Sequence, residues 1–122
     1  MRGVGIDIVD ARRIEKSLRR RTDFAEQVFS GQERQFCEAQ RRPGQHYAAC
    51  FAAKEAFLKA VGLGIFSGVA LPDIEVVHSP AGAPGLRLGP SAVDALARAG
   101  GEAALLGLSH ERDLALAVVV VE

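Results

Sequence analysis

Alternating hydrophobic and polar positions predict β-strands at both ends of the chain. Near the start, Val4, Ile6 and Ile8 alternate with small or polar residues, which is the two-residue period of a strand. Positions 114–121 are apolar throughout, with Leu, Leu, Val and Val on one face and Ala, Ala, Val and Val on the other. A strand that is apolar on both faces needs cover on both sides, and a chain of 122 residues has little mass to supply it. We therefore expect an oligomer.

Helical periods and capping residues mark helices between these strands. The expected helices begin after Asp10, at Ser30, near Gln45 and at Pro90, and the last three end near Gln40, Val61 and Ala99. Asp10 can cap the first helix, and Ser30 with Glu33 has the spacing of a capping box. We expect Pro43-Gly44 to break the chain before the third helix, the strongest of the four, which Gly62 closes.

The second half of the chain consists mainly of predicted strands. They are expected at 74–77, 86–88, 105–109 and 114–121, with a loop at 79–85 and a polar turn from His110 to Asp113. The fold class is therefore α+β, with a long central helix packed against a mostly antiparallel sheet. The length fits a single domain, residues 1–122.

Composition excludes several classes of protein. Hydrophobic residues make up 48% and charged residues 25%, which is typical of a globular chain. Fifteen basic residues balance fifteen acidic ones, which argues against a nucleic-acid coat or a membrane binder. Two cysteines are too few for a disulfide framework, and the longest apolar run is too short to span a bilayer. The start of the chain lacks the pattern of a secretion signal, so we expect a cytoplasmic protein.

The charges are unevenly distributed. Residues 1–61 carry 12 basic and 8 acidic side chains, whereas residues 62–122 carry 3 and 7. Most of the basic excess lies in one segment, which contains Arg12, Arg13, Lys16, Arg19, Arg20 and Arg21 and a single opposing acid, Glu15. Such a segment is either a solvated helix face or a docking surface for an acidic partner. Composition alone does not choose between them.

Three polar residues occupy positions where apolar ones are expected. Asp7 lies inside the first strand, Glu55 on the apolar side of the long helix, and His110 beside the last strand. Burial of an unpaired carboxylate costs several kcal/mol, so each acid needs a cation, a proton or a donor. Two such carboxylates could hold Mg²⁺. Alternatively, Glu55 forms a helix-surface ion pair with Lys59, Asp7 bonds the next turn, and His110 is an ordinary hairpin residue.

Three sequence blocks resemble one enzyme family. They are Gly3-Val4-Gly5-Ile6-Asp7-Ile8-Val9, Phe51-Ala52-Ala53-Lys54-Glu55-Ala56-Phe57-Leu58-Lys59-Ala60, and Ser109-His110 followed by Ala115 and Ala117-Val118-Val119. In this order and spacing they resemble the 4′-phosphopantetheinyl transferases, specifically the small stand-alone holo-(acyl-carrier-protein) synthase group. The resemblance extends over the whole chain, and its central block is the most specific.

The resemblance implies an activity and an assembly. The implied reaction moves the phosphopantetheine arm of coenzyme A onto a serine of an apo acyl carrier protein, a small acidic partner, and releases adenosine 3′,5′-bisphosphate. The implied assembly is a homotrimer with each active site between neighbouring subunits, which agrees with the doubly apolar last strand. Mg²⁺ is the implied cofactor, and neither nucleic acid nor a membrane is an expected partner.

The resemblance also implies roles for individual residues. The metal ligands would be Asp7 and Glu55, and the catalytic residues Glu55, Lys59 and His110. The coenzyme A contacts would be Phe51, Lys54, Lys59, Gly62, Pro84, Ser109 and His110. The carrier protein would dock on Arg12, Arg13, Lys16, Arg20 and Arg21. His110 is the first candidate for the base that takes the serine proton, ahead of a metal-bound water or Glu55.

The chain departs from the family pattern at two positions. Cys50 stands where relatives commonly have Arg, and Ala83 replaces the Lys of a Gly-Lys-Pro loop. At Cys50 any phosphate contact made by that Arg is missing or moved, and Ala83 loses a cation near the nucleotide. Coenzyme A would therefore bind more weakly or through another arginine such as Arg87. Two other functions stay open: a hot-dog-type acyl-coenzyme A thioesterase or dehydratase, and a non-catalytic module that binds an acidic partner.

Overall fold

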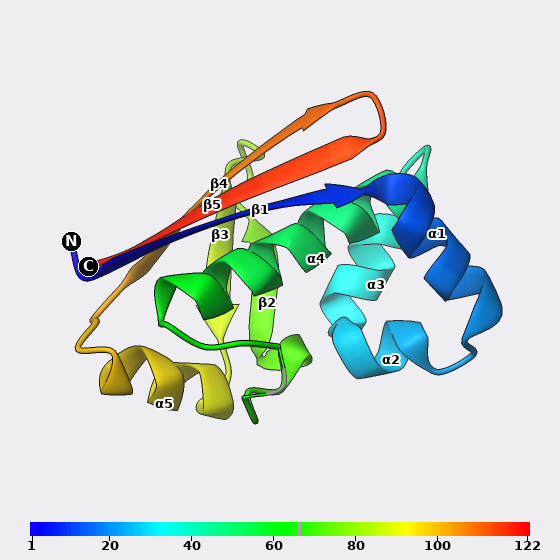
Figure 1. The fold of residues 1–122 in the computed structure, drawn as a ribbon. Helices are drawn as coiled ribbons and strands as arrows, with labels where there is room; N and C mark the ends of the chain where they lie inside the picture. Colours follow the sequence, from blue (N-terminus) through cyan, green and yellow to red (C-terminus); the bar gives the residue numbers. More distant parts are fainter. Residues whose placement is uncertain (66) are drawn as a thin grey trace.

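A three-stranded sheet and one long helix organise the chain (Figure 1). This computed structural model describes residues 1–65 and 67–122. The elements in chain order are β1 (Gly3–Asp10), α1 (Ala11–Arg20), α2 (Phe24–Val28), α3 (Gly31–Glu38), α4 (Pro43–Ala60), the 3-10 turn η1 (Leu71–Asp73), β2 (Ile74–His78), β3 (Pro84–Leu88), α5 (Pro90–Arg98), β4 (Ala104–Glu111) and β5 (Leu114–Val121). The predicted α+β class is confirmed.

Two antiparallel sheets share α4 between them. The larger has the strand order β1-β5-β4, and β2 pairs with β3 in a separate hairpin. Figure 1 shows α4 running along one face of the larger sheet, with α1, α2 and α3 gathered at one end and α5 at the other. The opposite face of the larger sheet carries no helix in the described part of the chain. The long helix therefore lies at the centre of the fold, as expected.

Glycines allow β1 and α4 to approach closely. A Cβ atom on Gly5 would lie 1.9 Å from the carbonyl oxygen of Ala56, and one on Gly3 would lie 2.0 Å from that of Ala60. Real Cβ atoms essentially never come this close to a backbone oxygen, so only glycine fits at either position. The same inward face of β1 carries Asp7, which is thus held against the C-terminal half of α4.

A buried ion pair joins three elements in the core. Lys54 of α4 and Glu33 of α3 are both fully buried, with Nζ of Lys54 2.7 Å from Oε1 of Glu33. The Lys54 ammonium also donates to the backbone oxygens of Leu71 and Ile74, and Glu33 accepts from the backbone N–H of Val76. Glu33 also completes the predicted capping box of α3. Because all these polar groups are satisfied, the pair can fix α3, α4 and β2 relative to one another.

Several element boundaries differ from the prediction. The helix α4 begins at Pro43, two residues before the predicted start, because proline fits the first turn of a helix, where an amide hydrogen is not needed. Gly44 is buried inside that turn against the Glu15 side chain. The short helix α2 was not predicted. His110 lies within β4 rather than in the turn, which consists of Arg112 and Asp113.

The larger sheet is apolar on both faces, and only one is buried. On β5, Ala115, Ala117, Val119 and Val121 are completely buried against α4. On the other face, Val4, Ile6 and Ile8 of β1 each expose more than half of their surface. The alternation of β5 is therefore confirmed, and the cover expected for its second face is not supplied by the described residues of this chain.

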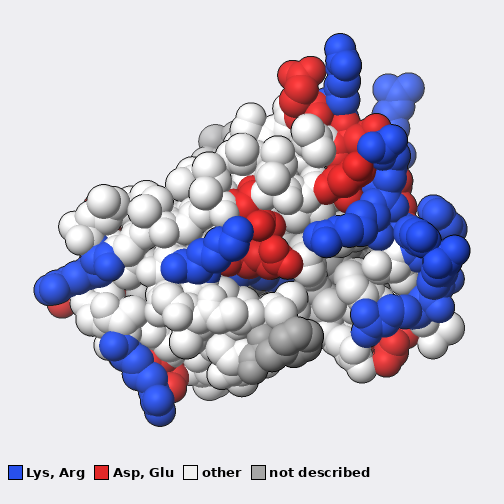
Figure 2. All heavy atoms as spheres, in the orientation of Figure 1, with Lys and Arg blue, Asp and Glu red and all other residues white. Residues whose placement is uncertain are grey.

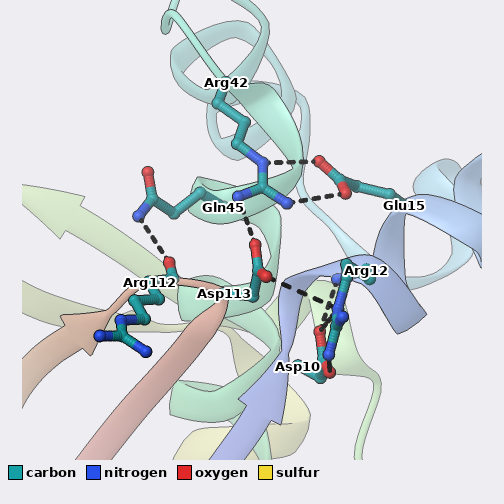
Figure 3. A network of polar contacts seen from close by, with 7 residues as sticks. All are labelled: Asp10, Arg12, Glu15, Arg42, Gln45, Arg112 and Asp113. Carbon is teal, nitrogen blue, oxygen red and sulfur yellow. Dashed lines mark hydrogen bonds and ion pairs between the residues drawn. The ribbon is translucent and has the colours of Figure 1, made fainter.

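A polar network connects α1 to the start of α4 and to the β4–β5 turn (Figure 3). The Arg42 guanidinium donates two hydrogen bonds of 3.0 Å to the Glu15 carboxylate and one of 2.7 Å to Asp113. The Arg12 side chain pairs with Asp10, whose carboxylate also caps α1 as predicted. Contact with Arg12 lowers the pKa of Asp10 to about 2. The network holds the basic helix α1 in a defined orientation.

None of the described helices combines the length and the apolar character needed to cross a membrane.

Candidate active site

Asp7 and Lys59 form an ion pair where β1 crosses α4. The Lys59 ammonium lies 3.0 Å from Oδ1 of Asp7 and 3.0 Å from the backbone oxygen of Ile6, and donates to both. The Asp7 side chain is only 11% exposed, whereas that of Lys59 is 54% exposed. The second carboxylate oxygen of Asp7, Oδ2, is buried and accepts no hydrogen bond from the described residues while Glu55 is ionised. A buried oxygen without a donor is costly, which marks this position as a site for a ligand.

Glu55 lies beside Asp7 on α4, one turn before Lys59. Burial is the main reason why the pKa of Glu55 rises to about 7, and a hydrogen bond to Asp7 and the charge of Asp7 add to the rise. The charges of Arg13 and Lys59 act in the opposite direction. The structure therefore brings together Asp7, Glu55 and Lys59, three of the residues that the sequence predicts to act together. The alternative in which Lys59 merely pairs with Glu55 is wrong, because its ammonium pairs with Asp7.

The two carboxylates fit a hard divalent cation such as Mg²⁺. Both side chains offer oxygen ligands, and the charge of each carboxylate disfavours ionisation of the other unless a cation is present. No group of three or more His, Cys, Asp or Glu side chains suited to a metal occurs in residues 1–65 and 67–122. A cation held by Asp7 and Glu55 would therefore take its other ligands from water or from substrate oxygens, as Mg²⁺ commonly does.

His110 and Pro84 lie together in a separate cleft of about 480 Å³. The cleft is lined by Phe36, Gln45, His46, Ala49, Cys50, Val76, His78, Ser79, Gly82, Pro84, Leu108 and His110. It contains no lining residue of the pockets around Asp7, Glu55 and Lys59 among the described positions. The long helix contributes its N-terminal half to the cleft and its C-terminal half to the acidic pair. Within one chain the two groups of predicted site residues are thus separate.

The cleft contains two histidines that the sequence analysis did not single out. His78 stacks on Phe36, with ring centroids 4.2 Å apart, and His46 meets the same ring edge-on at 5.9 Å. Burial, and then the charges of His110 and His78, lower the pKa of His46. Spacing offers no signal for this group, because its members come from α4, β2 and β4. Ser109, next to His110 on β4, is exposed and does not line the cleft.

Two predicted coenzyme A contacts are buried or partly buried in the core. Lys54 has no exposed surface, and its ammonium already makes three hydrogen bonds inside the core, so the structure offers a ligand no free surface of this side chain. Phe51 packs against Phe24 and retains 8% of its surface. Gly62 follows α4 in a left-handed conformation, with φ of 79°, and is exposed.

Cys50 and Ala83, the two departures from the family pattern, lie in different environments. The Cys50 thiol is buried against that of Cys37, and this contact, together with burial, raises its pKa. Cys50 is therefore a packing residue rather than a reactive thiol. Ala83 lies in the exposed turn between β2 and β3. Arg87 pairs with Glu75 and Gln32 and lines a different pocket, which argues against its replacing the missing cations.

The predicted docking residues are all exposed and lie on or next to α1. They are Arg12, Arg13, Lys16, Arg20 and Arg21. Figure 2 shows basic side chains gathered over the end of the molecule where α1 and α2 lie. The Arg13 guanidinium lies over the Phe51 ring at 5.9 Å, and its charge acts to lower the pKa of Glu55. This arrangement extends the basic surface to the edge of the acidic pair.

Comparisons with known proteins agree over the whole chain. Residues 3–119 match the model of the 4′-phosphopantetheinyl transferase superfamily. A holo-[acyl-carrier-protein] synthase of Syntrophus aciditrophicus is 46% identical over 121 residues, covering 98% of this chain and 94% of that protein.

Solved structures give the same result. The holo-[acyl-carrier-protein] synthase of Neisseria meningitidis superposes with a TM-score of 0.89 and 35% identity, covering 100% of this chain and 98% of that one. The Helicobacter pylori enzyme in complex with coenzyme A has a TM-score of 0.83 and 34% identity, covering 98% of this chain and 99% of that chain. The chain with its paired carboxylates Asp7 and Glu55 therefore belongs to the 4′-phosphopantetheinyl transferase superfamily.

Proposed function

We propose that this protein is a holo-(acyl-carrier-protein) synthase. It transfers the 4′-phosphopantetheine group of coenzyme A to a serine hydroxyl of an apo acyl carrier protein and releases adenosine 3′,5′-bisphosphate. The observation that carries the proposal is the meeting of Asp7, Glu55 and Lys59 in a chain that matches holo-(acyl-carrier-protein) synthases from end to end. Residues 1–122 act as a single transferase domain in this proposal.

The acidic pair and Lys59 supply the electrostatics of phosphoryl transfer. Asp7 and Glu55 would hold Mg²⁺, whose chemistry is to neutralise charge on the pyrophosphate of coenzyme A. The Lys59 ammonium is half exposed beside this pair, where it can neutralise or protonate the departing bisphosphate. Substrate phosphates can approach Lys59 through the shallow pockets on either side of it.

The proton of the attacking serine needs a base. His110 is exposed at the wall of the cleft and is our first candidate, with Glu55 as the alternative. The pKa of Glu55 is raised to about 7 in the metal-free protein, and a cation bound to this carboxylate would lower it, which favours His110 over Glu55 as the base. Coenzyme A would extend from the cleft of His110 and Pro84 to the phosphates beside Lys59.

A second copy of the chain is part of the proposed site. In one chain the cleft of His110 and the acidic pair share no lining residue among those described. The apolar outer face of β1 and β5 offers a surface through which copies can associate. We therefore propose a homotrimer in which His110 of one copy faces Asp7 and Glu55 of the next.

The acidic carrier protein would dock on the basic helix α1. The exposed arginines there complement an acidic helical bundle, and Arg13 links this surface to the side of the acidic pair. The hot-dog alternative is wrong, because the superposed structures with TM-scores of 0.83 and 0.89 are holo-(acyl-carrier-protein) synthases. Nothing in the described residues favours a non-catalytic module.

Intact-mass spectrometry of an apo carrier protein tests the proposal. We expect a gain of one phosphopantetheine with coenzyme A and Mg²⁺, and no gain with EDTA or with the Asp7→Ala or Glu55→Gln variant. A gain that persists in EDTA would reject the magnesium site and keep the transferase. No gain with any of several carriers, while coenzyme A still binds, would reject the transfer itself.

A further inference from the structure

Lys59 neutralises the Asp7 carboxylate that a divalent cation would use. Its ammonium lies 3.0 Å from Oδ1 of Asp7 and is fixed there by a second hydrogen bond, also 3.0 Å, to the backbone oxygen of Ile6. The remaining oxygen of Asp7 is buried and accepts no hydrogen bond from the described residues while Glu55 is ionised. Lys59 is thus the counter-ion that stabilises the Asp7 carboxylate in the metal-free protein.

A metal ion and this ammonium cannot both lie against Asp7 without strong repulsion. Coulomb repulsion between a divalent cation and an ammonium grows as the separation falls, and burial of Asp7 reduces the screening by solvent. Arg13 already contributes a second positive charge near Glu55. Entry of a metal therefore favours departure of the Lys59 ammonium.

Lys59 is able to leave. Its side chain is 54% exposed, and its flexible four-carbon stem carries a compact charge. Two pockets adjoin it: one includes Asp7 and Ile8, and the other includes Glu55 and Gly64. The ammonium can move from the first pocket towards the second by rotation of its own side chain, without movement of β1 or α4.

We propose that Lys59 is an exchangeable counter-ion that competes with the divalent cation for Asp7, so that metal binding releases Lys59 for contact with the phosphates of the substrate. This inference rests on the metal site of the proposed function. It links two events: the ammonium leaves Asp7 when the metal arrives, and a phosphate that attracts the ammonium strengthens metal binding. Lys59 then weakens metal binding in the absence of substrate and favours it in its presence.

Titration of the free protein with Mn²⁺, followed by the electron paramagnetic resonance signal of the unbound ion, tests the competition without any turnover. Lys59→Met should bind Mn²⁺ at least about tenfold more tightly than the unsubstituted protein, and Lys59→Arg, which keeps the charge, should not. Arg98→Met on α5 removes an exposed charge elsewhere and should leave the affinity unchanged. Asp7→Asn should abolish the binding in both Lys59 backgrounds. Equal affinities for the unsubstituted protein and Lys59→Met, including no binding by either, would overturn the proposal.

Trace acetylation of lysines, measured by peptide mass spectrometry, tests the release of the ammonium in the unsubstituted protein. Saturating Mn²⁺ should increase the labelling of Lys59 several-fold relative to exposed Lys16, which serves as the internal reference. Unchanged relative labelling would overturn the displacement. The carrier-protein mass assay stands apart from both measurements: turnover together with equal Mn²⁺ affinities rejects only the role of Lys59, whereas absent turnover rejects the transfer reaction.

Discussion

Replacement of Gly5 by alanine should separate the two carboxylates of the site. An added Cβ would lie 1.9 Å from the Ala56 oxygen, and ordinary contact begins at 3.4 Å, so β1 and α4 must move apart by about 1.5 Å. The atoms of α4 that this Cβ would meet belong to the backbone of Ala56 and Ala60, so rotation of a side chain cannot relieve the clash. Because Asp7 lies two residues further along the same face of β1, its distance from Glu55 on α4 must increase.

The expected cost can be estimated from two opposing effects. Overpacking of a core costs about 1–3 kcal/mol, and alanine recovers about 0.5–1 kcal/mol of the entropy that glycine loses on folding. Because the clash is with backbone, we take the upper end of the overpacking cost, about 3 kcal/mol, and expect a net loss of about 2 kcal/mol, which corresponds to a decrease of roughly 8 °C in Tm for a chain of this size. A displacement of about 1 Å at reacting groups costs on the order of 100-fold in rate, so kcat should fall at least that far.

Thermal unfolding and the carrier-protein mass assay measure both quantities on the same preparations. The matched control is Gly85→Ala in β3, where the added Cβ would lie 3.8 Å from a Val77 methyl group, an ordinary contact. It should leave the Tm unchanged or slightly raised. The assay is performed well below the Tm, with a far-ultraviolet circular dichroism spectrum to confirm folding. Wild-type stability and kcat in Gly5→Ala would refute the argument that the glycine sets the spacing of the site.

Three further predictions follow from other contacts. Lys54→Met leaves the Glu33 carboxylate buried without its cation and should lower the free energy of unfolding by about 3–5 kcal/mol in denaturant titrations. Lys16→Met, at an exposed position, should change it by less than about 0.5 kcal/mol, and equal values for the two variants would reject a stabilising ion pair. In the metal-free protein, Glu55 keeps its proton between about pH 4.5 and 7 when folded and releases it when unfolded, so the free energy of unfolding should fall as pH rises through this range. The difference in Tm between this protein and Glu55→Gln should therefore change with pH, and a constant difference would contradict the raised pKa of Glu55. Rising salt should increase KM for the carrier protein through slower association, and Arg13→Gln should reduce this salt dependence whereas Arg98→Gln should not. A KM that does not change with salt would show that the basic helix α1 does not dock the carrier protein.

Local sequence signals account for much of the fold. The caps at Asp10 and Ser30 and the alternation of β5 depend on residues close together in the chain, and all three are confirmed. The predicted start of α4, near Gln45, is wrong, because proline can either break a helix or occupy its first turn, as Pro43 does here. Only tertiary contact decides between these outcomes, here the packing of Gly44 against Glu15.

The site was only partly predictable, for a related reason. Asp7 and Glu55 stand out because a charged residue interrupts an apolar pattern, and the structure brings them together. Lys54 interrupts the same helix, yet its charge is satisfied inside the core by Glu33. A sequence pattern detects a buried charge but does not reveal its partner. Of the cleft lining, His110 and Pro84 were singled out, whereas His46 and His78 gave no signal because they are distant from His110 in sequence.

The two faces of β1 connect the site to the assembly. Its inner face carries two glycines and Asp7 with a single buried apolar side chain, Val9, so the strand contributes mainly close backbone contact there. Its other large apolar side chains, Val4, Ile6 and Ile8, lie on the outer face, which the described residues leave exposed. In most two-layer folds the large side chains of a strand face the helix. Here that arrangement is largely reversed, so much of the hydrophobic free energy available to β1 would be gained only if another copy covered the sheet, as proposed above. The strand that positions Asp7 would then be most firmly held in the assembled protein, which is also where His110 of a neighbour would reach the acidic pair.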